Sequence, residues 1–122
     1  MKVLFSLFVA IGLAGCATPA DLRKKPPALD MTSKKSAKEV ALCIAEKWEN
    51  TKPFMGLSSP PVNTNIRPDG YSITATDINW MGSSTTVTLA DVTEIKTESA
   101  TRYYKQGGGG FGDYDQAVME CQ

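Results

Sequence analysis

The stretch SAKEVALCIAEKWEN, Ser36–Asn50, decides how the rest of the chain folds. It opens with a capping-box pattern, in which the Ser36 oxygen and the Glu39 side chain satisfy free amides of a first helical turn. Apolar residues then recur every three or four positions, the spacing of one helical face, at Ala37, Val40, Ala41, Ile44 and Trp48. The pattern predicts an amphipathic helix that ends near Asn50 and has one face available to cover a sheet.

A second, shorter helix is expected at the C-terminal end of the sequence. Asp113-Tyr-Asp-Gln116 is typical of a helix start. Four apolar residues that follow the same helical spacing fall on one face, namely Tyr114, Ala117, Val118 and Cys121. The sequence therefore predicts two helices with apolar faces, one before and one after a long central segment of the chain.

The central segment begins with a hairpin pattern. Residues 62–66 and 71–75 alternate between apolar and polar side chains, and the turn sequence Arg67-Pro-Asp-Gly70 separates the two runs. Alternation on both sides of a turn containing proline and glycine is typical of two antiparallel strands.

A further strand is expected at Thr85–Ile95 (TTVTLADVTEI), which is rich in β-branched residues, with Ala100–Gln106 as its return partner. The alternation slips at Ala90–Val92, which predicts a bulge or a break there. Together the patterns predict an α+β fold, in which the N-terminal helix packs on a three- to four-stranded antiparallel sheet and a short helix follows at the C-terminal end.

Length and composition exclude several classes of function. The chain has 122 residues, enough for one domain, with 13 basic and 13 acidic side chains and no histidine. Because the charges balance, no nucleic-acid partner is expected. Because histidine is absent, Ser-His-Asp and Cys-His catalysis are excluded, and so are most zinc sites.

The first fifteen residues have the organisation of an export signal. Met1 and Lys2 give a positive start, Val3–Leu13 is an apolar run, and Ala14 and Gly15 are small. A membrane-spanning helix needs about 20 apolar residues, so this run is too short to span.

The four residues Leu13-Ala-Gly-Cys16 resemble the lipobox of bacterial lipoproteins. The resemblance implies that residues 1–15 are removed, that Cys16 is diacylated and that its new amino group takes a third acyl chain. Ala17 stands where an aspartate usually retains such proteins in the inner membrane. This implies an outer-membrane lipoprotein of a Gram-negative cell, facing the periplasm. The alternative is a soluble secreted protein in which Cys16 is an unpaired thiol.

The segment after Cys16 is expected to be a disordered tether. Ala17–Lys35 has three prolines, scattered charges and no apolar period. As a flexible coil, nineteen residues span about 25 Å, so the folded part would stand off the membrane. The predicted organisation is a signal peptide at 1–15, an acylated cysteine and tether at 16–35, and a single α+β domain at 36–122.

Two cysteines remain once Cys16 is assigned to lipid. Cys43 lies in the first predicted helix and Cys121 in the last, each near an apolar face. An exported domain lies in an oxidising compartment, so we expect a Cys43–Cys121 disulfide. The alternative is two buried free thiols that pack as small hydrophobic side chains.

Two loops have compositions that bear on ligand or partner binding. The run GGGGFG at 107–112 lacks the lysine and hydroxyl residue of a phosphate-binding loop and is expected to be a flexible connection. The loop Asp77–Ser84 carries Trp80 and Met81, which either pack on the core or present an apolar anchor to a partner.

No catalytic, metal-binding or cofactor-binding residues are identified. The carboxylates Asp69, Asp77, Asp91 and Asp113 are scattered singly, so no acid–base pair is evident. We expect a non-catalytic lipoprotein that is anchored in the lipid membrane through Cys16 and binds a periplasmic or envelope protein. The alternative is an inhibitor or exclusion factor that blocks an incoming enzyme or phage component through the Trp80 loop.

Overall fold

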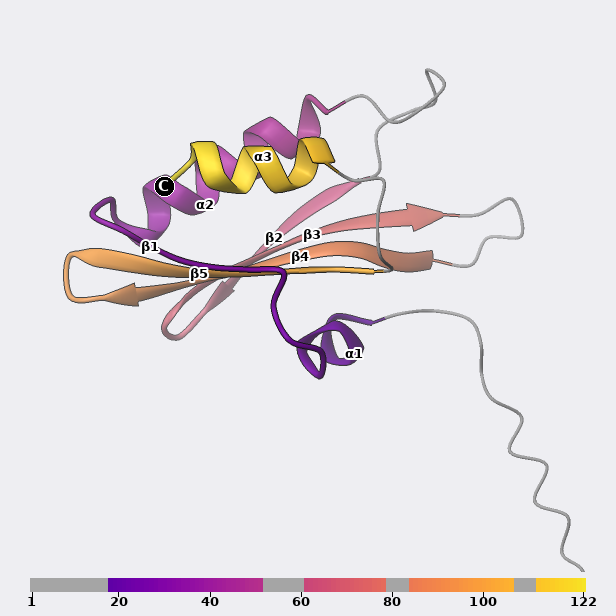
Figure 1. Ribbon diagram of the computed structural model, residues 1–122, viewed down its shortest axis with the longest axis horizontal. Helices are drawn as coiled ribbons and strands as arrows, with labels where there is room; N and C mark the ends of the chain where they lie inside the picture. Colours follow the sequence, from indigo (N-terminus) through magenta and orange to yellow (C-terminus); the bar gives the residue numbers. More distant parts are fainter. Residues whose placement is uncertain (1–17, 52–60, 79–83, 107–111) are drawn as a thin grey trace, which may run out of the picture.

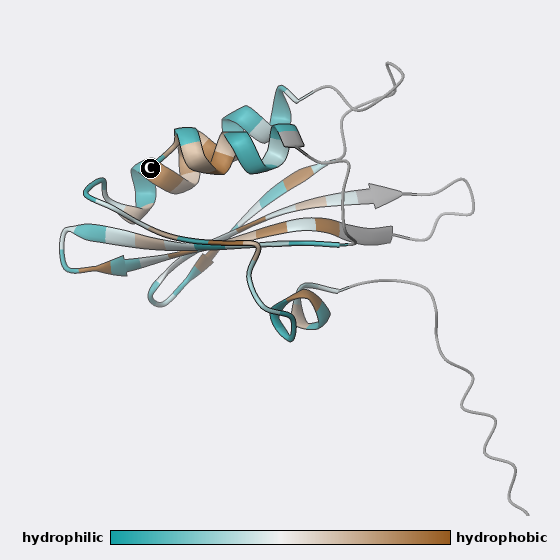
Figure 2. Ribbon diagram, viewed as in Figure 1, coloured by the Kyte–Doolittle hydropathy of each residue, from teal (hydrophilic) through white to brown (hydrophobic). Residues whose placement is uncertain are grey.

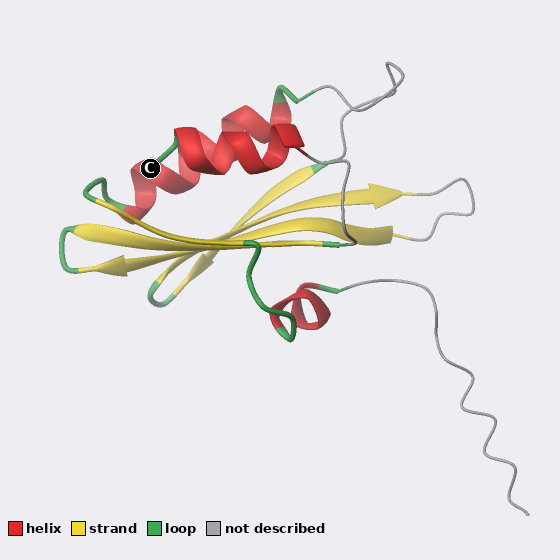
Figure 3. Cartoon of the chain, in the orientation of Figure 1, coloured by secondary structure: helices red, strands yellow, loops and turns green. Residues whose placement is uncertain are grey.

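The computed structural model describes residues 18–51, 61–78, 84–106 and 112–122 (Figure 1). These residues form three helices and five strands, which Figure 3 distinguishes by colour. In chain order they are α1 Pro19–Arg23, β1 Leu29–Ser33, α2 Ala37–Glu49, β2 Val62–Arg67, β3 Gly70–Ile78, β4 Ser84–Ile95, β5 Glu98–Lys105 and α3 Gly112–Glu120.

All five strands belong to one antiparallel sheet with the order β1-β5-β4-β3-β2. The chain begins at one edge with β1, crosses over through α2 to the other edge, and returns strand by strand until β5 pairs with β1. The predicted hairpin is confirmed: β2 and β3 pair with Val62 opposite Ala75, and two residues connect them.

Helices α2 and α3 lie on the same face of the sheet, which we call the α2/α3 face (Figure 1). The predicted first helix is confirmed, since the Glu39 amide donates to the Ser36 Oγ at 3.2 Å and α2 starts at Ala37. The apolar side of α2 packs toward the sheet (Figure 2) and is fully buried at Val40, Ile44 and Trp48.

Trp48 joins the two helices to the sheet. Its ring makes edge contacts with Tyr103 of β5 and Tyr114 of α3, with ring centroids 6.0 and 5.6 Å away. Its indole N–H donates to the Tyr114 carbonyl at 3.3 Å, so the buried polar group is satisfied. The predicted apolar face of the last helix is also confirmed, because Tyr114, Ala117, Val118 and Cys121 are buried.

The α+β class is confirmed, but the sheet has five strands rather than three or four. The additional strand is β1, which lies in the segment predicted to be a disordered tether. Its residues pair with β5, with Leu29 opposite Tyr103 and Ser33 opposite Ser99. The tether prediction is therefore wrong for most of its length, because backbone pairing at a sheet edge does not require a strong apolar pattern. The folded part begins before residue 36.

The face opposite α2 and α3 is covered in its centre by α1 (Figure 1), and we call it the α1 face. Because side chains alternate along a strand, Leu89 and Asp91 of β4 point to the α1 face while Ala90 and Val92 point to the α2/α3 face. The slip predicted at Ala90–Val92 reflects this two-sided burial. The register shift lies instead at Val87, which the pairings of Ala75 with Thr88 and Thr76 with Thr86 leave unpaired.

The predicted disulfide between Cys43 and Cys121 is present. It joins α2 to the residue that follows α3, with the two Cα atoms 5.7 Å apart, and closes a loop over a sequence separation of 78 residues. In the chain-entropy description, a loop of this length stabilises the fold by about 4.5 kcal/mol. The disulfide therefore fixes the two helices that form the layer over the α2/α3 face.

Candidate functional site

Helix α1 is a short segment that is capped at its N-terminal end. Thr18 and Asp21 form a reciprocal capping box, in which the Asp21 amide donates to the Thr18 Oγ1 at 3.3 Å and the Thr18 amide donates to the Asp21 Oδ2 at 3.1 Å. Pro19 occupies the first turn, where its missing N–H costs nothing. Hydrogen bonds from Thr18 lower the pKa of Asp21.

A helix of five residues is not stable alone in water, so α1 depends on its contacts with the sheet. Leu22 is 1% exposed and forms a small apolar cluster with Leu89 of β4 and Tyr104 of β5. The adjacent residues Tyr103 and Tyr104 are both buried, on opposite faces of β5, because α1 covers the second face.

The neighbouring residue, Arg23, binds Asp91 in the centre of the sheet with two hydrogen bonds. Its Nε donates to the Asp91 Oδ2 and its Nη2 to the Oδ1, each at 2.8 Å. Ser72 of β3 also donates to the Oδ1 at 2.6 Å, and the Arg67 Nη1 lies 3.2 Å from the same oxygen. A guanidinium that meets a carboxylate with two parallel bonds gives one of the strongest and most directional polar contacts in proteins.

Both members of this ion pair are charged at neutral pH. Burial raises the pKa of the Asp91 carboxyl, but hydrogen bonds from Arg23 and Ser72 outweigh burial, and the pKa is lowered overall. Hydrogen bonding to Asp91 raises the pKa of the Arg23 guanidinium. The ion pair therefore contributes fully above the pKa of an unfolded aspartate, about 3.9, and its contribution is lost as the pH falls through the lowered folded value.

The Asp91 cluster, which we define as Arg23, Arg67, Ser72 and Asp91, does not have the properties of a catalytic acid or base. A general base needs a pKa close to the working pH and an oxygen free to receive a proton. The Asp91 pKa is shifted away from neutrality, and both of its oxygens already accept hydrogen bonds. Its physical role is structural: the cluster holds α1 against β3 and β4.

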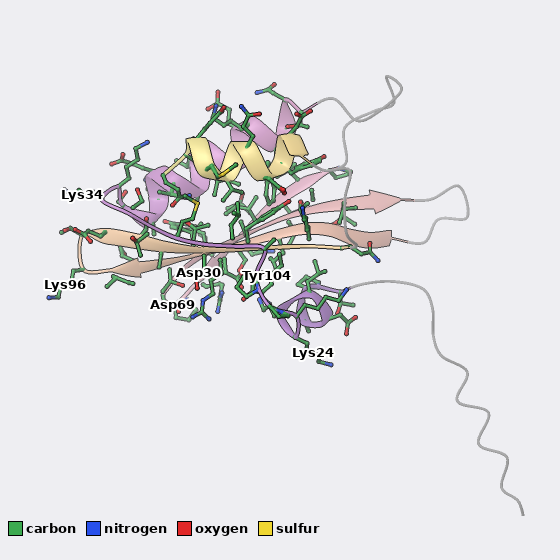
Figure 4. The ribbon with its side chains drawn as sticks, in the orientation of Figure 1. Lys24, Asp30, Lys34, Asp69, Lys96 and Tyr104 are labelled. Atoms are coloured by element: carbon green, nitrogen blue, oxygen red, sulfur yellow. A yellow bond between two sulfur atoms is a disulfide. The ribbon has the colours of Figure 1, made fainter. Side chains whose placement is uncertain are left out.

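Further charged and polar side chains surround α1 on the same face. The Arg102 Nε lies 3.8 Å from the Asp30 Oδ2, and the Arg67 Nε lies 3.9 Å from the Asp69 Oδ1. Figure 4 places Lys24, Asp30 and Asp69 on this side of the sheet, away from α2 and α3. The exposed part of the α1 face is thus polar and carries no large apolar patch among its described residues.

A second buried polar group lies beneath the first turn of α3. The Lys105 Nζ binds the Asp115 Oδ2 at 3.0 Å, with both side chains about three-quarters buried. Burial, and then the nearby Asp115 carboxylate, raise the pKa of Tyr103, so its phenol stays protonated. The Lys105–Asp115 ion pair holds the first turn of α3 on the sheet, and the protonated Tyr103 phenol is no nucleophile.

A shallow groove of about 260 Å³ runs between the end of α2 and α3, and it is lined by Lys47, Thr51, Asp113, Gln116, Ala117 and Glu120. Lys47 crosses it to bind the Glu120 Oε2 at 3.0 Å, and Gln116 donates to the Glu120 Oε1 at 2.9 Å. These hydrogen bonds lower the pKa of Glu120. The polar groups that line the groove are largely paired with one another, so the groove makes a weak ligand site.

The other site residues predicted from the sequence cannot be placed in the fold. Cys16, Trp80 and Met81 lie outside the described residues, as does the glycine run at 107–111. Within the described ranges, no group of three or more His, Cys, Asp or Glu side chains is arranged to hold a metal ion. None of the helices in the described part of the chain is long and apolar enough to cross a membrane.

Sequence reasoning missed Leu22, Arg23 and the role of Asp91. One local signal for α1 was available, since Thr18-Pro-Ala-Asp21 has a capping residue, a proline at the first helical position and an acid in the first turn. The two prolines that follow, Pro26 and Pro27, favoured a linker instead. The partner of Arg23 could not be found in this way, because Asp91 is 68 residues away.

Comparison with known proteins identifies no family for this chain. No family model matches the chain, and neither a curated protein nor a solved structure matches it.

Replacing Arg23 by glutamine should release α1 from the sheet. The change removes both hydrogen bonds to Asp91, so we expect the free energy of unfolding to fall by about 1–2 kcal/mol. Trypsin cleavage after Lys24 should accelerate on the order of tenfold, measured by mass spectrometry of timed digests.

The matched control is Arg102→Gln, which removes an arginine from the same face but only a loose, exposed ion pair with Asp30. It should change the free energy of unfolding by less than about 0.5 kcal/mol. Equal effects of the two substitutions would show that the Arg23–Asp91 contact does not hold α1.

Proposed function

We propose that this chain is the precursor of a membrane-anchored lipoprotein whose small non-catalytic domain binds a protein of the bacterial envelope. Residues 1–15 direct export and are removed, and Cys16 is acylated. Two or three acyl chains give durable membrane attachment without a protein span. The resemblance to bacterial lipoproteins, with alanine rather than aspartate at position 17, supports a location on the periplasmic side of the outer membrane.

The observation that carries the proposal is the Cys43–Cys121 disulfide. It uses two of the three cysteines of the chain in a structural bond, of a kind that persists in an oxidising compartment. The remaining cysteine is Cys16, at the end of the apolar leader and two residues before the first described residue. An acyl modification gives this single thiol a chemical role that a free exported thiol lacks.

The proposed activity of the folded domain is binding rather than catalysis. Its ionisable clusters at Asp91 and Asp115 pair their charges internally and hold helices on the sheet. The surface left to a partner therefore offers exposed polar and charged side chains and a few isolated apolar ones, such as Leu42 and Met119. Surfaces of this kind suit reversible contact with another folded protein.

Anchoring is tested by replacing Cys16 with serine in the full chain. The variant should lose all incorporation of labelled palmitate and leave the membrane fraction, because the acyl chains supply the attachment. The matched control is the double variant Cys43→Ser, Cys121→Ser, which removes the other two thiols and should keep the label. Palmitate label on the Cys16→Ser variant, or a mass showing an unmodified Cys16 in the wild-type protein, would defeat the proposal.

Partner binding is tested by cross-linking in intact envelopes followed by mass spectrometry. The wild-type protein should capture a resident envelope protein, and the Cys16→Ser variant should capture much less of it because the anchor concentrates both proteins at one surface. Equal capture by both variants would contradict anchored binding. An incoming enzyme or phage component as the captured protein would instead favour an inhibitory role.

A further inference from the structure

Docking of α1 leaves very little chain between the proposed anchor and the folded domain. Thr18 is already the capping residue of α1, and α1 is fixed to the sheet through Leu22 and Arg23. Only Ala17 lies between Cys16 and Thr18, and two Cα-to-Cα steps of fully extended chain span at most about 7 Å. The domain therefore cannot stand off the membrane on a long tether, and the side that carries the start of α1 stays next to the lipid.

The two sides of the domain differ in charge. The segment from Pro19 to Lys25 contains Arg23, Lys24 and Lys25 against a single acid, Asp21. Helices α2 and α3 together contain two basic residues, Lys38 and Lys47, against the acids Glu39, Glu46, Glu49, Asp113, Asp115 and Glu120. Because Arg23 is paired with Asp91, the basic charge left next to the anchor is that of Lys24 and Lys25, and the opposite helix layer has a net charge of −4.

The side chains of Lys24 and Lys25, next to the proposed anchor, are accessible to a charged surface. The Lys24 side chain is 79% exposed, with only a loose 3.9 Å contact to Asp21, and Lys25 is exposed as well. A lysine close to an anionic membrane surface strengthens binding about fivefold, and the effect falls off within about 8–10 Å in physiological salt. Lys24 and Lys25 follow Thr18 by six and seven residues, about 9–10 Å of helix, so they lie within this range when α1 lies along the membrane surface.

From these observations we infer that the α1 face is the membrane-facing side of the domain and that Lys24 and Lys25 contact anionic phospholipid headgroups. The inference rests on the proposed acylation of Cys16. The exposed part of the α1 face is polar, so it lies on the headgroups and does not insert into the hydrocarbon. The acidic layer formed by α2 and α3 is repelled by the same lipids and faces the aqueous compartment, where a protein partner would meet it.

The orientation is tested on the purified, acylated protein in vesicles of phosphatidylcholine and phosphatidylglycerol. The photoreactive residue benzoylphenylalanine replaces one exposed residue at a time, at Ala20 or Asn65 on the α1 face, or at Glu46 or Gln116 on the helix layer. After illumination, phospholipid adducts are measured by mass spectrometry. Adducts from Ala20 and Asn65 should exceed those from Glu46 and Gln116 by at least about fivefold. Equal yields, or the reverse ratio, would overturn the orientation.

A matched pair of charge variants tests the role of the lysines. Lys24→Gln with Lys25→Gln should lower the adduct ratio about fivefold or more, because the two charges nearest the anchor are lost. Lys34→Gln with Lys35→Gln removes an equal charge at the β1–α2 turn, where Figure 4 places Lys34, and should leave the ratio unchanged. Equal effects of the two double variants would overturn the assignment to Lys24 and Lys25.

The same preparation separates failure of the orientation from failure of the anchor. Its intact mass reports the acyl chains on Cys16 directly. Acylated protein without a preference between the faces would overturn the orientation and leave the anchoring proposal intact. Protein without acyl chains would overturn both.

Discussion

The bidentate ion pair between Arg23 and Asp91 fixes where the chain enters its folded domain. Asp91 lies in a central strand and is almost fully buried, and such a carboxylate is stable only if its charge is compensated. Arg23 supplies that compensation from α1, with Ser72 and Arg67 completing the hydrogen-bonding shell. The requirement to satisfy one buried charge thereby positions a helix that is too short to fold alone.

The consequences extend to the composition of the sheet. Because α1 covers one face while α2 and α3 cover the other, β4 and β5 are buried on both sides at their centres. Strands of this kind bury neighbouring side chains on opposite faces, which explains Leu89 and Ala90 side by side, and Tyr103 beside Tyr104. With Cys16 acylated as proposed, the Arg23–Asp91 contact also shortens the connection between the lipid anchor and the folded domain. A flexible tether would span about 25 Å, whereas the chain from Cys16 to Thr18 spans at most about 7 Å. A small domain would then have a defined orientation at the lipid surface.

Much of this architecture is predictable from local sequence patterns. The helix from Ser36, the Arg67–Gly70 turn and the disulfide all rest on signals within one segment or on cysteine count, and the structure agrees with them. Helix α1, strand β1 and the Asp91 cluster were missed because each depends on a distant partner. β1 forms a strand because it pairs with the edge of β5. Arg23 holds α1 on the sheet because Asp91 lies beneath it. The slipped alternation at Ala90–Val92 was the local sign that both faces of β4 are covered.

The central claim is that α1 is held on the sheet by a charged Asp91, and amide hydrogen exchange across pH tests it most directly. At neutral pH the amides of Leu22 and Lys25, which bind the carbonyls of Thr18 and Leu22, should exchange far more slowly than in an unfolded peptide. As the pH falls below about 3.9, this protection should disappear while that of β4 persists, since protonation of Asp91 removes the ion pair. Exchange of the α1 amides at the unfolded rate at neutral pH, or protection unchanged through the acid range, would contradict the account.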